Sequence, residues 1–148
     1  MKRGFEVVSY IDATKVLIPQ RQTEKSAGYD LASIEDIIIP PKTIAFVKTG
    51  LKVKLEDYEV LLVYARSSLG VKKQLIMSNG VGVIDADYYN NPSNEGHIMV
   101  PLYNMSEVAV EIKAFERVAQ GIFQTYLKTD NDQPVSRLRD GGFGSSGQ

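Results

Sequence analysis

Hydrophobic and polar residues alternate along this chain over short stretches, and little of it sustains a helical period. The alternation is clearest over 43–48 and 51–55, which we expect to pair as a half-buried hairpin. A short helix is predicted over 67–73, capped by Ser67 or Ser68. Further strands are predicted over 5–10, 37–39, 59–64, 74–77, 97–103, 108–112 and 118–127. Many short strands separated by turn residues predict an all-β sandwich or jelly roll.

The end of the chain does not follow this pattern. From Thr129 onward the sequence is polar and lacks periodicity, and four of the twelve glycines fall in the last eight residues. We therefore expect residues 1–128 to form a single β domain and residues 129–148 to form a flexible glycine-rich arm. Phe143 lies between two glycines of this arm, where a simple linker needs no aromatic side chain.

Composition removes several classes of function. The 148 residues include no cysteine and one histidine, His97, which excludes thiol nucleophiles, iron–sulfur clusters and cysteine-bound zinc. A Ser-His-Asp triad is possible only with His97 as its base. Seventeen Lys and Arg against eighteen Asp and Glu argue against a dedicated nucleic-acid-binding protein. Because no signal peptide or membrane span is visible, we expect a cytoplasmic protein with no membrane partner.

Two internal segments carry residues suited to chemistry. In residues 65–70, a strand runs into a helix start with Arg66, Ser67 and Ser68, which together suit an oxyanion or phosphate; the alternative is a serine cap beside a surface arginine. In residues 79–89, an Asn-Gly turn precedes Asp85 and Asp87, placed on one side of an extended strand as a general base or a water-mediated metal ligand. The alternative for this segment is a polar turn with tyrosines packed beside it.

The tail is the third such segment. Residues 139–147 combine glycines, hydroxyls and an arginine that suit phosphate binding, with an aromatic ring that suits stacking on a planar base. By composition alone this segment is a disordered end. All three segments point to the same ligand, a nucleotide with several phosphates.

Five segments in order then resemble the homotrimeric dUTPase family. They are AGYDL (27–31), ARSSL (65–69), NGVGVIDADY (79–88), ERVAQ (116–120) and GGFGSSG (141–147). The resemblance spans nearly the whole chain and implies a distorted jelly roll of the β-clip type, in which three subunits share three active sites. It also implies Mg²⁺-assisted hydrolysis of dUTP to dUMP and pyrophosphate, which keeps uracil out of DNA and supplies dUMP for thymidylate synthesis.

The resemblance also implies roles for particular residues. Asp85 takes a proton from the water that attacks the α-phosphorus, and the ring of Tyr88 lies against the deoxyribose. Asp30 orders the water shell of a Mg²⁺ ion that the substrate phosphates hold. Uracil is read by the backbone of Asn79, Gly82, Val83 and Ile84. The implied phosphate and arm contacts are Arg66, Ser67, Ser68, Gln120, Arg139, Gly144, Ser145 and Ser146, with Phe143 stacked on uracil from a third subunit.

The sequence departs from the family pattern at two places. Ala65 stands where proline is usual, and Leu138 stands where the arm often has its arginine, so Arg137 and Arg139 both remain candidates and Arg139 is assigned to the γ-phosphate.

Two rival functions stay open. A dCTP deaminase-like enzyme is disfavoured because Pro101 stands where that family has its catalytic glutamate. The other rival is a non-catalytic trimer that senses nucleotides or binds proteins. We expect His97 to be structural or on the surface, and Arg117 to be structural.

Overall fold

The computed structural model describes residues 1–135, and the structural statements that follow concern this part of the chain. The strands are β1 (Gly4–Val7), β2 (Tyr29–Ala32), β3 (Ile37–Ile39), β4 (Ile44–Lys48), β5 (Leu51–Lys54), β6 (Glu59–Ala65), β7 (Leu75–Met77), β8 (Gly82–Asp85), β9 (Met99–Asn104), β10 (Val110–Ile112) and β11 (Arg117–Thr125). The helices are α1 (Ser67–Lys73) and two 3₁₀ turns, η1 (Ala13–Lys15) and η2 (Ala86–Tyr88).

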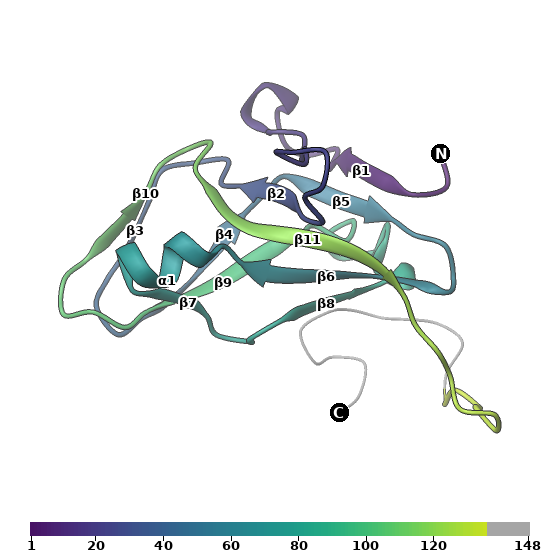
Figure 1. The fold of residues 1–148 in the computed structure, drawn as a ribbon. Helices are drawn as coiled ribbons and strands as arrows, with labels where there is room; N and C mark the ends of the chain where they lie inside the picture. Colours follow the sequence, from purple (N-terminus) through teal and green to yellow (C-terminus); the bar gives the residue numbers. More distant parts are fainter. Residues whose placement is uncertain (136–148) are drawn as a thin grey trace.

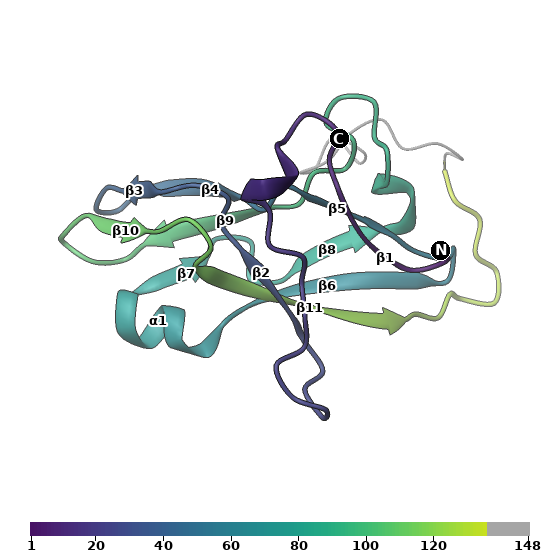
Figure 2. The same cartoon turned by 90° about the horizontal axis from the view of Figure 1, so that it is seen from above.

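The strands form antiparallel sheets in two main layers. One is a four-stranded sheet in the order β2-β11-β6-β8, and the other is a three-stranded sheet in the order β4-β9-β7; β1-β5 and β10-β3 are two-stranded (Figures 1 and 2). Leu61 and Val63 of β6 belong to the same buried cluster as Val47 of β4 and Leu102 of β9, so the two larger sheets share one core. The predicted all-β fold of jelly-roll type with one short helix is confirmed.

The sequence pattern located most elements as short apolar or alternating runs between turn residues, and burial alternates in strands such as β5 and β7. The helix over 67–73 and the strand over 37–39 have the predicted bounds, and the other predicted strands differ at their ends by a few residues. The strand β2 was not predicted. Three of its four residues are buried, Asp30 among them, so it shows no alternation of apolar and polar residues.

The predicted hairpin of 43–48 with 51–55 is wrong. β4 pairs with β9 and β5 pairs with β1. The reason lies in the backbone between the two strands, which bonds to a distant segment. The amide of Thr49 donates to the carbonyl of Ile98 over 3.3 Å, and the amide of Ile98 donates to the carbonyl of Leu51 over 2.7 Å. The chain therefore crosses from one sheet to another at this turn.

Two details of the 79–89 segment also differ from the prediction. The Asn79-Gly80 turn is present, but the strands beside it pair elsewhere, β7 with β9 and β8 with β6. Asp85 and Asp87 do not share one side of a strand, because the 3₁₀ turn η2 begins directly after Asp85. The strand therefore presents Asp85 at its end and leaves Asp87 in the turn.

Candidate active site

A buried carboxylate lies between two arginines at one end of the four-stranded sheet. Asp30 is 8% exposed, and its Oδ1 and Oδ2 atoms lie 3.8 Å from Arg66 Nε and 3.7 Å from Arg117 Nε respectively. Arg66 also donates to the carbonyl of Arg117 over 3.4 Å. Two guanidinium groups beside one carboxylate leave a positive excess, and arginine is well suited to binding phosphate oxygens.

Strand pairing brings these side chains together. β11 lies between β2 and β6, and Gln120 on β11 is opposite Asp30 on one side and Tyr64 on the other. Arg66 follows the last residue of β6. The predicted phosphate ligands Arg66 and Gln120 and the predicted metal-water ligand Asp30 thus lie in one neighbourhood.

Ser67 and Ser68 begin helix α1 beside this neighbourhood, and both are exposed. The predicted serine cap is wrong, because Arg66 is the residue at the cap position and no side-chain hydrogen bond caps the helix. The chain enters the helix directly from the sheet, which shifts the cap one residue earlier than the hydroxyls.

The other predicted residues lie along β8 and the turns on either side of it. Asn79 is exposed in the turn before β8, and Val83 is 62% exposed, whereas Ile84 and Asp85 are half-buried. Tyr88 is 8% exposed at the end of η2. Gly82 begins the strand, opposite Val63. β8 is the edge strand of the four-stranded sheet, and its exposed Val83 is followed by a carboxylate and a tyrosine.

Asp85 and Arg66 lie at opposite ends of β6, whereas Gly82 is opposite Val63, nearer the Arg66 end. Asp85 is opposite Val60, whereas Arg66 follows Ala65 at the other end. Six residues of extended strand separate the two ends by about 20 Å. Asp85 and Arg66 of one chain therefore do not lie side by side.

The described residues offer little to a metal ion directly. Residues 1–135 contain no group of three or more His, Asp or Glu side chains placed to hold one. Asp30 Oδ2 is, however, buried and accepts no hydrogen bond. An acceptor in that state suits the ordered water of an ion whose other ligands come from elsewhere.

Comparison with known proteins decides the family. The family model described as dUTPase matches residues 14–147. The chain belongs to the dUTPase family. It is 47% identical to a deoxyuridine 5′-triphosphate nucleotidohydrolase of Lactococcus lactis subsp. lactis, over 98% of this chain and 97% of that protein. These findings confirm the predicted family and the prediction of an enzyme of this family.

Solved dUTPases have the same fold. The crystal structure of dUTPase from Streptococcus mutans matches with a TM-score of 0.82 and 46% identity, over 86% of this chain and 99% of that chain. A dUTPase of Staphylococcus bacteriophage 80alpha matches with a TM-score of 0.73 and 20% identity, over 90% of this chain and 96% of that chain. The second likeness shows the fold alone.

The predicted arm contacts of this dUTPase-family chain fall in residues 139–146. Arg139, Phe143, Gly144, Ser145 and Ser146 lie outside the described residues, so their assignments stay predictions. The last described strand, β11, ends at Thr125, two residues before the predicted end.

Within residues 1–135, no helix is long and apolar enough to cross a membrane.

His97 has a structural position. Its side chain is 2% exposed, Nε2 accepts the Gly50 amide over 2.8 Å, and Nδ1 lies 2.8 Å from the Tyr10 hydroxyl. Burial, helped by the charge of Lys48, lowers the pKa of the imidazole to about 4, so the ring is neutral at pH 7. Of the two predicted positions, the structural one is right and the surface one is wrong.

Two residues near the candidate site were not assigned to it from the sequence. Arg117 was expected to be structural, yet it lies beside the same carboxylate as Arg66. Its place as the second residue of the ERVAQ segment was the available signal. Asn94 contacts the Tyr88 hydroxyl from a loop that follows η2, and no pattern in the sequence indicates that contact.

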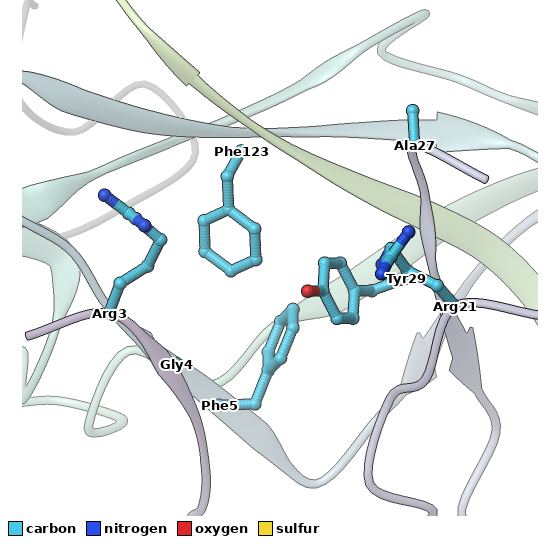
Figure 3. Close-up of a pocket in the computed structure, with 7 residues that line it drawn as sticks. All are labelled: Arg3, Gly4, Phe5, Arg21, Ala27, Tyr29 and Phe123. Carbon is cyan, nitrogen blue, oxygen red and sulfur yellow. The ribbon is translucent and has the colours of Figure 1, made fainter. Parts of the chain in front are cut away.

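A cavity of about 420 Å³ lies between β1, β2 and β11 (Figure 3). Phe5, Tyr29 and Phe123 meet there edge to face or tilted, with Arg3 and Arg21 at its margins. None of the predicted site residues lines this cavity. Tyr29, which precedes Asp30, connects the aromatic cluster to the candidate site.

Proposed function

We propose that this chain hydrolyses dUTP to dUMP and pyrophosphate. The observation that carries the proposal is the arrangement of Arg66, Arg117 and Gln120 around the buried carboxylate of Asp30, in a chain of the dUTPase family. A net positive cluster with fixed guanidinium groups favours a polyphosphate over a neutral ligand. The Lactococcus lactis relative carries the name of this activity.

In the proposed reaction, Asp85 accepts a proton from a water molecule as the water oxygen forms a bond to the α-phosphorus. The bond from the α-phosphorus to its bridging oxygen breaks, and pyrophosphate leaves with that oxygen. Arg66, Ser67, Ser68 and Gln120 bind the phosphate oxygens and align the bond that breaks. Most of the catalysis then comes from positioning and from compensation of phosphate charge.

Asp30 is the residue that we propose to hold a water molecule of a Mg²⁺ ion bound by the substrate phosphates. The buried Oδ2 atom without a hydrogen bond supports this assignment. When bound, the ion supplies charge neutralisation of the triphosphate. The protein then contributes orientation of the water shell, since its described residues form no direct ligand set.

Base and sugar selection is assigned to the β8 edge. The backbone of Asn79, Gly82, Val83 and Ile84 presents donors and acceptors to uracil. Cytosine would leave some of these polar groups without a hydrogen-bond partner, at a cost of about 1 to 3 kcal/mol for each. The ring of Tyr88 occupies the space that a ribose 2′-hydroxyl would need. Both assignments come from the family resemblance and agree with the edge position of β8 and the fixed position of Tyr88.

We also propose that the chain forms a homotrimer with shared sites. The outer face of the β4-β9-β7 sheet carries Ile44 and Phe46, each 50% exposed, and Ile76, 40% exposed. Ile44 and Ile76 are both opposite Tyr103, so the exposed residues form one apolar patch. A patch of this kind marks a protein contact. The separation of Asp85 from Arg66 along β6 also supports sites built from several subunits, over which the arm of residues 129–148 closes.

The decisive experiment measures turnover of dUTP, dCTP, dTTP and UTP with Mg²⁺, scoring pyrophosphate and ammonia separately. We expect pyrophosphate from dUTP and at least a hundredfold lower kcat/KM for the other three. Ammonia from dCTP would show a deaminase instead. Binding of dUTP without either product would show a nucleotide-sensing protein.

A further inference from the structure

The hydroxyl of Tyr88 is anchored at two points inside the protein. It accepts a hydrogen bond from Asn94 Nδ2 over 2.8 Å and donates one to the carbonyl of His97 over 3.2 Å. The tyrosine side chain is 8% exposed and follows Asp85 by three residues. A ring held at its far end in this way has little freedom to tilt.

The loop of residues 89–96 folds back onto Tyr88. The amide of Asn91 donates to the Tyr88 carbonyl over 3.1 Å. Gly96 has φ +81° and passes so close that a Cβ there would lie 2.2 Å from the same carbonyl oxygen. Only glycine fits this combination of left-handed backbone and close approach. The loop therefore packs against Tyr88 from both the side-chain and the backbone side.

The orientation of the Asn94 amide is fixed by the loop itself. Its Oδ1 atom accepts the Gly96 amide over 2.9 Å and Asn91 Nδ2 over 3.1 Å. With the oxygen committed to two donors, the NH₂ group faces the Tyr88 hydroxyl. Asn94 is thus both held and directed by contacts that involve no substrate.

We propose that Asn94 is a positioning residue that sets the discrimination of deoxyribose from ribose by fixing the Tyr88 ring. The proposal rests on the proposed function. An added hydroxyl is hard to reject by shape alone if the wall of the pocket can move, because a small displacement makes room for it. Rejection requires a wall whose own position is locked by supporting contacts. Asn94 and the His97 carbonyl supply that support.

The test compares kcat/KM for dUTP and UTP in the full chain and in Asn94→Ala, Tyr88→Phe and the double variant, each checked for folding by circular dichroism. We expect kcat with dUTP to stay within about threefold in Asn94→Ala. The ratio of kcat/KM for UTP to kcat/KM for dUTP should rise about tenfold. Tyr88→Phe keeps the ring and loses the anchor, so it should raise the ratio similarly. Asn94→Ala should add little in the Tyr88→Phe background. Ser93→Ala, which loses a hydrogen bond to Asn91 in the same loop, is the matched control and should leave the ratio unchanged.

An unchanged ratio in Asn94→Ala or in Tyr88→Phe overturns the proposal, as does an Asn94→Ala effect that persists fully in the Tyr88→Phe background. If Asn94→Ala does not fold, Tyr88→Phe decides alone, because it removes the anchored hydroxyl and changes no residue of the loop. A parent chain that releases no pyrophosphate from dUTP overturns the proposed function and this inference together. Turnover by the parent with an unchanged ratio in the variants overturns this inference only.

Discussion

Gly28 lies directly beneath the side chain of Gln120. A Cβ built at Gly28 would be 2.4 Å from Gln120 Oε1 and 3.0 Å from Gln120 Cβ, so any larger residue displaces that side chain. The contact couples the AGYDL segment to the residue that we assign to the substrate phosphates. Two segments almost a hundred residues apart therefore act on one side-chain position.

From this contact we predict that Gly28→Ala raises KM for dUTP about tenfold, because Gln120 is pushed from its place beside Asp30. Steady-state kinetics at varied dUTP checks the prediction. Gly70→Ala is the matched control, since the nearest atom to a Cβ there is a backbone oxygen at an ordinary 3.7 Å. Equal kinetics in both variants would show that Gln120 does not bind the substrate.

Asp85→Asn separates binding from chemistry. The amide keeps the size of the carboxylate but is a poor proton acceptor, so we predict dUTP binding within about threefold and turnover lower by about 10²- to 10⁴-fold. Calorimetric titration and pyrophosphate release measure the two quantities. Asp87→Asn, two residues along in η2, is the control and should retain turnover. A parallel loss of binding and turnover in Asp85→Asn would make Asp85 a structural residue.

The apolar patch on the β4-β9-β7 sheet predicts the assembly state. Replacing both Ile44 and Ile76 by lysine places two charges on the patch, and we expect the proposed trimer to dissociate because unpaired charges are costly to bury. Light scattering coupled to size exclusion measures the mass. Ile38→Lys, at a site 65% exposed on β3, is the control and should leave the mass unchanged. A double variant that stays trimeric would place the subunit contact elsewhere.

His97 predicts an acid dependence of stability. Its pKa is about 4 in the folded protein and near 6.5 in the unfolded chain, so between these values the unfolded chain binds the additional proton. The contribution of His97 to the free energy of unfolding is therefore complete above pH 6.5 and is lost as the pH falls toward 4. Contacts from Ser9 and Lys52 lower the pKa of Glu95 to about 2. The contribution of Glu95 to the free energy of unfolding is therefore lost only as the pH falls below about 4.5.

Urea unfolding at pH 7, 5.5 and 4.5 checks this window. We expect the stability of the parent to fall across it, and His97→Gln to be less stable at pH 7 with a shallower dependence on pH. Turnover by the folded variant should remain near that of the parent, because the His97 side chain contacts Gly50 and Tyr10, and the backbone carbonyl that holds Tyr88 is retained. An unaltered pH dependence in His97→Gln would assign the acid sensitivity to other groups.

Local patterns account for what could be predicted of the fold. The helix over 67–73 and most strands follow from short-range alternation and turn residues, which depend on neighbours in the chain. The pairing partner of each strand does not follow from these short-range patterns. Residues 49–51 bond to the side chain of His97 and the backbone of Ile98, and this contact, nearly fifty residues away in the chain, is what replaces the predicted hairpin. Pairing over such separations is set by the whole core.

The sequence by itself determined the family, the all-β class and the identity of the candidate residues, because the five ordered segments and the period-two pattern are properties of the chain alone. Only the tertiary structure decided which of those residues meet. Pairing of β11 with β2 and β6 unites Asp30, Arg66 and Gln120, whereas the length of β6 keeps Asp85 at the far end. The tertiary structure also decided that Asn94 supports Tyr88, since that contact depends on the path of a folded loop.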